Sequence, residues 1–275
     1  MKSVHFASLS LLHHLGKERP PMLHCWHHHE DTTPRIFLHG FSGSVQVWEQ
    51  TLSHVEGKDT ALGLHLPGHH PGHRIDGGTF EALVDNMALA IESFTQRPGH
   101  LIGYSLGGRI ALSLCLRHPR LVENLTLIGA HPGLDTETER RERRAGDARW
   151  ARLLRNDGIK AFVAAWEGLP LFASQNSLPP VLLEMQRKIR LEHDPQALAD
   201  CLDTMGLGQM PNYLSRMCEI DIPVQLAVGA DDTKFIGLAH RMAEKLPHHR
   251  LFEIPHCGHN PLLEAPASLA ELLST

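Results

Sequence analysis

Apolar and polar positions alternate in blocks over the first half of the chain. Short apolar runs, which are typical of buried strands, are followed by longer segments in which apolar residues recur every three or four positions, as on one face of a helix. Strands are predicted at 4–14, 22–29, 35–38, 60–64, 100–104 and 122–128, the first two as a hairpin. Helices are predicted at about 45–55, 79–94 and 106–117. Such an alternation favours parallel strands with helices on both faces of a sheet.

This pattern stops at about Gly133 and resumes after Arg216. No apolar strand is evident between them, and helical periodicity fits residues 136–155, 157–167, 179–192 and 195–204. Further on, strands are predicted at 224–228 and 251–254, and helices at 235–246 and 261–273. We therefore expect an α/β core of residues 1–132 and 217–275, built on a mostly parallel eight-stranded sheet, and a helical cap of residues 133–216 inserted into it.

Composition excludes several classes of protein. Hydrophobic residues make up 42% of the 275 and charged residues 21%, which is ordinary for a globular chain. The net charge of -5 at pH 7 gives no reason to expect nucleic acid or an anionic membrane as a partner. The five cysteines are odd in number and form no C-x-x-C pair, and we find neither a signal peptide nor a membrane span. We expect a cytoplasmic protein with reduced thiols.

Histidine is unusually frequent, with 22 residues and two clusters. One cluster comprises His24 and His27-His28-His29, and the other comprises His65, His69, His70 and His73. Imidazole is a common metal ligand. However, the first cluster lies on a predicted edge strand and turn, the second lies on a predicted loop, and neither has an accompanying frame of cysteines or carboxylates. We therefore expect no metal and no cofactor.

The clearest chemical motif is Gly103-Tyr104-Ser105-Leu106-Gly107, between the strand at 100–104 and the helix at 106–117. A Gly-x-Ser-x-Gly in this position predicts a nucleophile elbow, a sharp turn that exposes a serine hydroxyl above a sheet. Side chains beside the serine would clash in so tight a turn, which is why the glycines are needed. Because glycine and serine are common, the motif alone is a weak signal, and its partners elsewhere in the chain decide the matter.

The expected partners follow in the order that α/β-hydrolases use, an acid and then a histidine. Asp232 comes directly after the strand at 224–228, and His259 comes after the strand at 251–254. We expect His259 to take the Ser105 proton, while Asp232 holds the imidazole tautomer and stabilises its charged form.

Each partner has a competing neighbour. His256 competes with His259, but Gly258 favours a tight, exposed loop position for His259. Asp231 competes with Asp232, which we prefer because of the motif context described below.

His39-Gly40-Phe41 supplies the expected second half of an oxyanion site. The backbone N–H groups of Phe41 and Leu106 are expected to point at one pocket, where such donors stabilise negative charge developing on oxygen. Any one of these motifs alone is best interpreted as a turn. Found together, in order and each after a strand, they predict a hydrolase-type site.

Arginines near the predicted site indicate an acidic substrate. Arg109 lies one helical turn after Ser105 and can face the same pocket, which is unusual for an enzyme of neutral esters. In the cap, the alternating arginines and glutamates of 137–144 are mostly typical of a solvated helix face, with one or two arginines available to the pocket. Guanidinium groups pair well with planar carboxylates, so we expect a small-molecule polycarboxylate as substrate.

The chain resembles the menaquinone-pathway family of 2-succinyl-6-hydroxy-2,4-cyclohexadiene-1-carboxylate synthases, which have the α/β-hydrolase fold. The matching stretches cover nearly the whole chain and are His39 to Gly43, Leu66 to His69, Gly103 to Arg109, His131 to Leu134 with Arg140, Arg143, Asp147 and Trp150, Trp166 with Pro170 and Phe172 to Ser174, Gly206-x-Gly208-Gln209, Asp232 to Phe235, and Gly258 to Asn260. The Gly-Gly-Arg extension of the elbow, the His-Pro-Gly-Leu run and the Asp-x-Lys-Phe segment are the more specific of these.

This resemblance implies a lyase rather than a hydrolase, acting on 2-succinyl-5-enolpyruvyl-6-hydroxy-3-cyclohexene-1-carboxylate. Ser105, activated by His259 and Asp232, would abstract a ring proton and so trigger the loss of pyruvate, without an acyl-enzyme. The substrate-binding residues that it implies are Tyr104, Arg109, Arg143, Trp166, Phe172 and Arg187. For Trp166 and Phe172, packing within the cap is an equally good interpretation.

Two departures from the family pattern bear on this interpretation. His65 stands where an aspartate usually precedes Leu-Pro-Gly-His, and Glu167 follows Trp166 where an aromatic residue is common. An acid at 167 is expected either to weaken carboxylate binding or to pair with a nearby arginine. Two other functions stay open: a serine hydrolase of a small acidic ester or of a carbon–carbon bond beside a ketone, and a non-catalytic small-molecule receptor.

Overall fold

A seven-stranded sheet runs through the middle of the molecule in the computed structural model, which describes residues 22–29, 31–55, 59–69, 75 and 77–274. The strand order is β1-β3-β2-β4-β5-β6-β7, and among these strands β1 alone pairs antiparallel. Their bounds are β1 Leu23–His27, β2 Arg35–Leu38, β3 Ala61–Leu64, β4 Gly99–Tyr104, β5 Val122–Ile128, β6 Val224–Gly229 and β7 His249–Ile254. The eighth predicted strand, at 4–14, lies outside the described residues.

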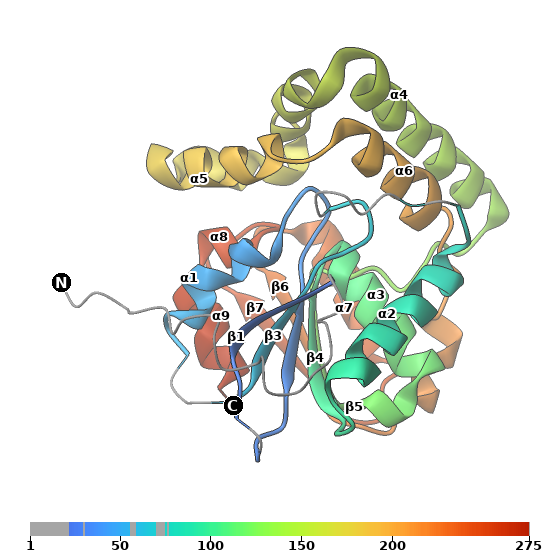
Figure 1. Cartoon of the computed structure of the whole chain (residues 1–275), viewed down its shortest axis with the longest axis vertical. Helices are drawn as coiled ribbons and strands as arrows, with labels where there is room; N and C mark the ends of the chain where they lie inside the picture. The colour runs from blue at the N-terminus through green and yellow to red at the C-terminus, as the bar shows by residue number, and fades with distance from the viewer. Residues whose placement is uncertain (1–21, 30, 56–58, 70–74, 76, 275) are drawn as a thin grey trace.

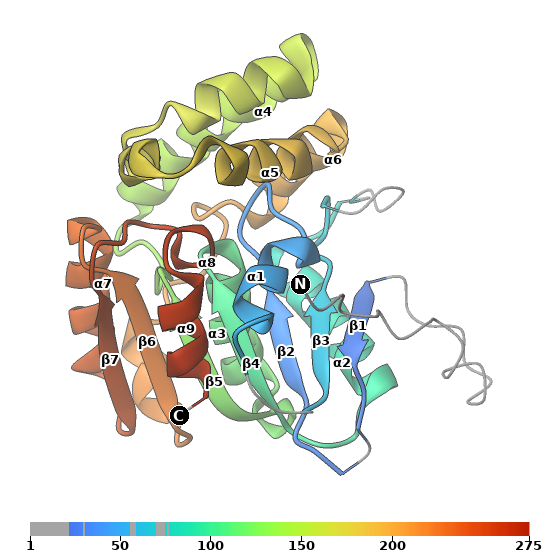
Figure 2. The ribbon, with the colours of Figure 1, turned by 90° about the vertical axis from the view of Figure 1, so that its left-hand side faces the viewer.

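Helices cover both faces of the sheet (Figures 1 and 2). One face carries α2 Phe80–Phe94, α3 Leu106–Arg117 and α7 Thr233–Ala243, and the other carries α1 Glu49–Leu52, α8 Pro261–Glu264 and α9 Pro266–Leu273. Because successive strand residues point to opposite faces, a central strand such as β2 or β4 must be apolar on both sides. The continuous apolar runs that predict these strands therefore reflect burial from two sides.

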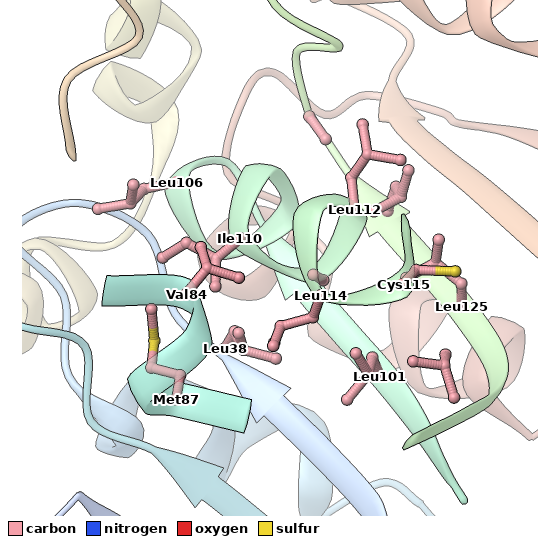
Figure 3. Packing of buried hydrophobic residues seen from close by; sticks show 14 of the residues in the cluster. Leu38, Val84, Met87, Leu101, Leu106, Ile110, Leu112, Leu114, Cys115 and Leu125 are labelled. Atoms are coloured by element: carbon pink, nitrogen blue, oxygen red, sulfur yellow. The ribbon is translucent and has the colours of Figure 1, made fainter. Parts of the chain in front are cut away.

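The alternation is visible residue by residue in the two central strands. Leu38 and Leu101 point to the face of α3, where Figure 3 shows them near Ile110 and Leu114. Phe37 and Ile102 belong to the core on the opposite face. These side chains are fully buried, so β2 and β4 form a fixed platform for the loops that follow them.

Helix ends agree with the sequence where a cap or a proline marks them. Thr79 caps α2 by accepting a hydrogen bond from the Ala82 N–H. The helix predicted at 261–273 is divided into α8 and α9, because Ala265 precedes Pro266 and adopts φ -147°, outside the helical range. The helix predicted at 45–55 is a 3₁₀ turn, Val45–Trp48, followed by the short α1. Ser44 caps this turn by accepting a hydrogen bond from the Gln46 N–H.

The helices of the interval 133–216 lie together above the carboxyl ends of the strands (Figures 1 and 2). They are α4 Glu137–Glu167, α5 Pro180–Leu191 and α6 Pro195–Met205, and the structure, which describes this whole interval, places no strand in it. α4 begins with a capping box between Thr136 and Glu139 and bends at Gly158, whose φ is 79°. Phe162 and Leu198 pack between α4 and α6 in a separate apolar cluster.

This separate cluster supports the proposed division into a core and an inserted cap, with the boundaries at 133 and 216 standing as a proposal. In the part of the chain that the structure describes, no helix combines the length and apolar character needed to cross a membrane.

Candidate active site

Ser105 lies on a strained turn between β4 and α3. Its backbone has φ 52° and ψ -107°, a conformation that non-glycine residues rarely adopt. A Cβ on Gly103 would lie 2.4 Å from the Gly107 carbonyl oxygen, and a Cβ on Gly107 would lie 2.2 Å from the Leu38 carbonyl oxygen. Neither contact is sterically possible, so both glycines are required by close backbone approach. This is the geometry of a nucleophile elbow.

A chain of two hydrogen bonds joins Ser105 to His259 and Asp232. His259 Nε2 lies 3.1 Å from Ser105 Oγ, and His259 Nδ1 lies 2.7 Å from Asp232 Oδ2. Because a carboxylate only accepts hydrogen bonds, Nδ1 carries the proton and Nε2 accepts from the serine hydroxyl. The imidazole is 3% exposed, so this tautomer is held inside the protein and away from competing water.

The loop that carries His259 is held on both sides. The Glu264 carboxylate accepts hydrogen bonds from the N–H groups of Gly258 and Asn260, at 2.7 and 3.1 Å. The Phe235 ring packs against the imidazole with centroids 4.3 Å apart. A Cβ on Gly129 would approach His259 Cε1 to 3.1 Å, so the loop that follows β5 also lies against the imidazole ring.

The two competing residues point elsewhere. Asp231 and His256 are exposed, whereas Asp232 and His259 are buried. The Asp231 N–H donates to the Cys257 carbonyl, which ties the acid loop to the histidine loop and orients the next residue inward.

The loop at 39–43 lies beside the elbow, as an oxyanion loop must. A Cβ on Gly40 would lie 2.7 Å from the Tyr104 ring and 3.6 Å from Ser105 Cβ. Phe41 lines the same cavity as Ser105, and Leu106 opens α3, where the first N–H groups have no helical carbonyl to bond. Both expected donors therefore belong to segments that meet at Ser105.

Two buried histidines build this loop. His69 Nε2 accepts from the N–H of Ser42, whose φ is 58°, and its Nδ1 donates to the Pro67 carbonyl. His39 Nδ1 donates to the Gly40 carbonyl, while Nε2 accepts from the Leu66 N–H. Burial lowers the pKa of His39 to about 3 and that of His69 well below its ordinary value, so both rings are neutral at pH 7.

The histidine clusters of the sequence thus contain at least one scaffold residue, His69. His70 and His73 lie outside the described residues. Among the residues that the structure does describe, no group of three His, Cys, Asp or Glu side chains is arranged to hold a metal ion.

A cavity of about 110 Å³ opens above Ser105 between the loops and the cap. Its walls come from the 39–43 loop, the elbow, the histidine loop, the end of α4 and one side of α5. The lining side chains include Phe41, Tyr104, Ser105, Trp166, Phe172, Met185, Gln186, Ile189, Arg190, His259, Asn260, Leu262 and Leu263.

Three predicted substrate-binding residues, Tyr104, Trp166 and Phe172, line this cavity. Trp166 also stacks on Phe162 at 5.2 Å between ring centroids and meets the Phe41 ring at 5.4 Å. Cap packing and a place in the cavity wall are therefore compatible roles for the same aromatic side chain.

Arg109 and Arg143 lie apart from this cavity lining. Arg109 is buried on α3 and donates from Nη1 to the Met205 carbonyl at 2.9 Å. Arg143 Nε donates to Asp147 at 2.9 Å, and the two arginines repel each other across this carboxylate. Burial lowers the pKa of Arg109 to about 10, which leaves it charged at pH 7. Their contact with substrate stays a prediction.

Arg187, which the resemblance implies as a substrate-binding residue, lies outside the cavity lining, and Arg190, which the sequence motifs do not mark, lies in it. Arg187 is 57% exposed and outside the cavity lining, whereas Arg190 is 6% exposed and lines the cavity, with its guanidinium carbon 5.2 Å from the Phe172 ring centroid. The helical repeat of α5 distinguishes the two arginines: Arg190 lies four residues after Gln186 and therefore on the same, cavity-facing side of the helix. Arg187 is rotated off that side.

This site and this fold define an α/β-hydrolase-type protein. The family model described as alpha/beta hydrolase fold matches residues 34–266. The chain is 36% identical to a Bacillus subtilis (strain 168) protein provisionally named 2-succinyl-6-hydroxy-2,4-cyclohexadiene-1-carboxylate synthase, over 87% of this chain and 88% of the relative. It is 32% identical to the synthase of that name from Enterobacter sp. (strain 638), over 87% and 89% of the two chains.

The structure of MenH from S. aureus superposes with a TM-score of 0.88 at 29% identity, over 92% of this chain and 97% of that chain. The chain therefore belongs to the 2-succinyl-6-hydroxy-2,4-cyclohexadiene-1-carboxylate synthase family of α/β-hydrolase-fold proteins.

Proposed function

We propose that the protein is a lyase that eliminates pyruvate from 2-succinyl-5-enolpyruvyl-6-hydroxy-3-cyclohexene-1-carboxylate to give 2-succinyl-6-hydroxy-2,4-cyclohexadiene-1-carboxylate. The observation that carries this proposal is the hydrogen-bonded chain from Asp232 through His259 to Ser105, which opens into a cavity that also holds a buried arginine. Relatives with this synthase name align over nearly the whole chain, which supports the same reaction.

The elimination follows from the orientation of these three side chains. Ser105 passes its proton to His259 Nε2, and its oxygen takes a proton from the substrate ring. The electron pair of that C–H bond forms a ring double bond while the C–O bond to the enolpyruvyl group breaks. The leaving group departs as the enolate of pyruvate, takes up the proton held by the His259 imidazolium and becomes pyruvate, so Ser105 and His259 end in their starting protonation states. Asp232 stabilises the imidazolium, and the Phe41 and Leu106 N–H groups stabilise negative charge that develops on a substrate oxygen.

The substrate's carboxylates have two groups of cations as candidate partners. Arg190 carries positive charge into the cavity itself. A second group combines Arg109, one turn along α3 from the serine, with Arg143 of α4. Tyr104, Trp166 and Phe172 would enclose the ring. We retain Arg187 as a motif-matched residue, but its exposed position favours an indirect role.

A small organic acid is the expected partner, with no nucleic acid or membrane involved. We propose a cytoplasmic location, because the buried cysteines Cys115, Cys201 and Cys257 carry free thiols.

The direct test supplies purified protein with the enolpyruvyl substrate and follows two signals, released pyruvate and the ultraviolet absorbance of the new conjugated diene. We expect both to appear together and in equal amounts. A serine hydrolase would instead cleave nitrophenyl esters rapidly and release no pyruvate. Binding without turnover of either compound would favour a receptor and contradict the lyase.

A further inference from the structure

One carboxylate holds two arginines of different exposure at the rim of the cavity. Glu167 ends α4 and is itself largely buried, with its side chain 16% exposed. Its Oε2 accepts from Nε and Nη2 of Arg187, at 2.8 and 2.6 Å. Its Oε1 accepts from Nη1 of Arg190 at 3.1 Å. Both oxygens are thus occupied, one from the solvent side and one from the cavity side.

The two arginines belong to different surroundings. Arg187 is 57% exposed, whereas the Arg190 guanidinium is buried over the Phe172 ring, and Arg190 lines the same cavity as Ser105. Within the described residues, Arg190 is the only lysine or arginine that lines this cavity. Any free positive charge that the cavity offers to an anion therefore depends on how fully Glu167 neutralises Arg190.

The charges of this cluster do not cancel. One carboxylate and two guanidinium groups leave a net charge of about +1, since arginine keeps its proton at neutral pH. Arg187 makes two hydrogen bonds to Glu167, both shorter than the single bond from Arg190. Arg187 thereby draws the carboxylate charge outward, and the residual positive charge stays on the buried side.

We propose that Glu167 and Arg187 are positioning residues: Glu167 fixes the direction of Arg190 in the cavity wall, and Arg187 occupies the carboxylate so that Arg190 remains available to a substrate carboxylate. The identity of that substrate rests on the proposed function, whereas the charge relation rests on the geometry alone. Neither residue needs to touch the substrate. Glu167, which departs from the family pattern, thus converts a surface arginine into a modulator of the site.

The two roles have opposite kinetic signatures. In Arg187→Gln the Glu167 carboxylate has Arg190 as its one charged partner and neutralises it more fully, so less positive charge is left for the substrate. KM for the enolpyruvyl substrate should therefore rise roughly three- to tenfold with kcat nearly unchanged. Glu167→Gln leaves the positive charge but loses its direction, so kcat should fall about tenfold without a rise in KM. Circular dichroism and thermal melting would establish that each variant is folded.

Lys188→Gln is the matched control, because it removes one positive charge from the neighbouring exposed position of α5. We expect its KM to stay within about twofold of the wild-type value. In the Glu167→Gln background, adding Arg187→Gln should raise KM no more than Lys188→Gln does, since the carboxylate through which Arg187 acts is gone. An Arg187→Gln effect equal to that of Lys188→Gln, or one that persists without Glu167, would overturn the proposal.

A wild-type protein that releases no pyruvate would contradict the proposed function before any variant is compared. The same five proteins would then be titrated with succinate, a simple dicarboxylate, in a calorimeter. The proposal predicts weaker succinate binding for Arg187→Gln than for wild type and Lys188→Gln. Equal dissociation constants, or no succinate binding to the wild type, would contradict it independently of the reaction.

Discussion

The loops at the carboxyl edge of the sheet and the helices above them hold their functional side chains in different ways. In the loops, Ser105 and His259 are fixed by backbone: strained dihedral angles, glycines without space for a Cβ, and amide hydrogen bonds. In the cap, Arg190 is fixed by a side-chain ion pair and an aromatic ring. Positions held by backbone constraints tolerate almost no substitution, whereas in a side-chain network a single substitution can change the charge and orientation of a neighbouring side chain.

The largest expected effect concerns the acid that orients the histidine. Asp232→Asn should lower the rate of pyruvate release about 10³- to 10⁴-fold, because the amide presents a donor to His259 and favours the wrong tautomer. Asp231→Asn, its exposed neighbour, should leave the rate nearly unchanged. The measurement is the steady-state rate of pyruvate release by both variants. Comparable losses in the two would show that the loop, rather than the hydrogen bond at 2.7 Å, matters.

Backbone control of the elbow predicts a stability effect. Gly107→Ala places a Cβ 2.2 Å from the Leu38 carbonyl oxygen, so we expect a loss of about 3 kcal/mol or more in the free energy of unfolding. Gly237→Ala is the matched control, because it lies in α7 with open space around it and should gain roughly 0.5–1 kcal/mol. Urea unfolding measures both. Equal stability of the two variants would contradict the proposed close approach.

The buried histidines of the oxyanion loop predict an acid-sensitive fold. The pKa of His39 is lowered to about 3 by burial, so below about pH 6.5 the His39 ring is protonated in the unfolded chain but stays neutral in the folded chain. Stability should therefore fall by about 1 kcal/mol per pH unit for this ring between pH 6 and 4. His39→Gln should flatten the urea-derived pH profile, and His256→Gln, at an exposed position, should not. Profiles of equal slope would refute this.

In the cap the predicted change is smaller and includes binding. Arg190→Gln should raise KM about tenfold and lower kcat by about the same factor as Glu167→Gln, because both the charge-assisted hydrogen bond to a substrate carboxylate and its direction are lost. Arg190→Lys keeps the charge but not the planar geometry and should give an intermediate KM. An unchanged KM in Arg190→Gln would remove this residue from the binding site and leave Arg109 and Arg143 as the candidates.

The same contrast explains what could be predicted from sequence. The elbow and the acid loop follow strands with clear apolar runs, and the histidine loop follows a shorter one at Leu251–Ile254. The turn residues then leave one competing neighbour for the acid and one for the histidine. The division of the final helix at Ala265 is local as well, and a proline marks it. By contrast, whether Arg187 or Arg190 enters the cavity depends on how α5 is rotated against the core, and motif matching contains no such information. The first strand of the predicted sheet, at 4–14, stays a prediction.

The central claim is that Ser105 acts as the base of an elimination. The most direct measurement is the rate of pyruvate release by wild type and by Ser105→Ala, at saturating substrate and with folding of the variant verified. We predict a loss of about 10³-fold or more in kcat with KM little changed, because the cavity and its cations are intact while the proton acceptor is gone. A variant that still released pyruvate at the wild-type rate would contradict the claim.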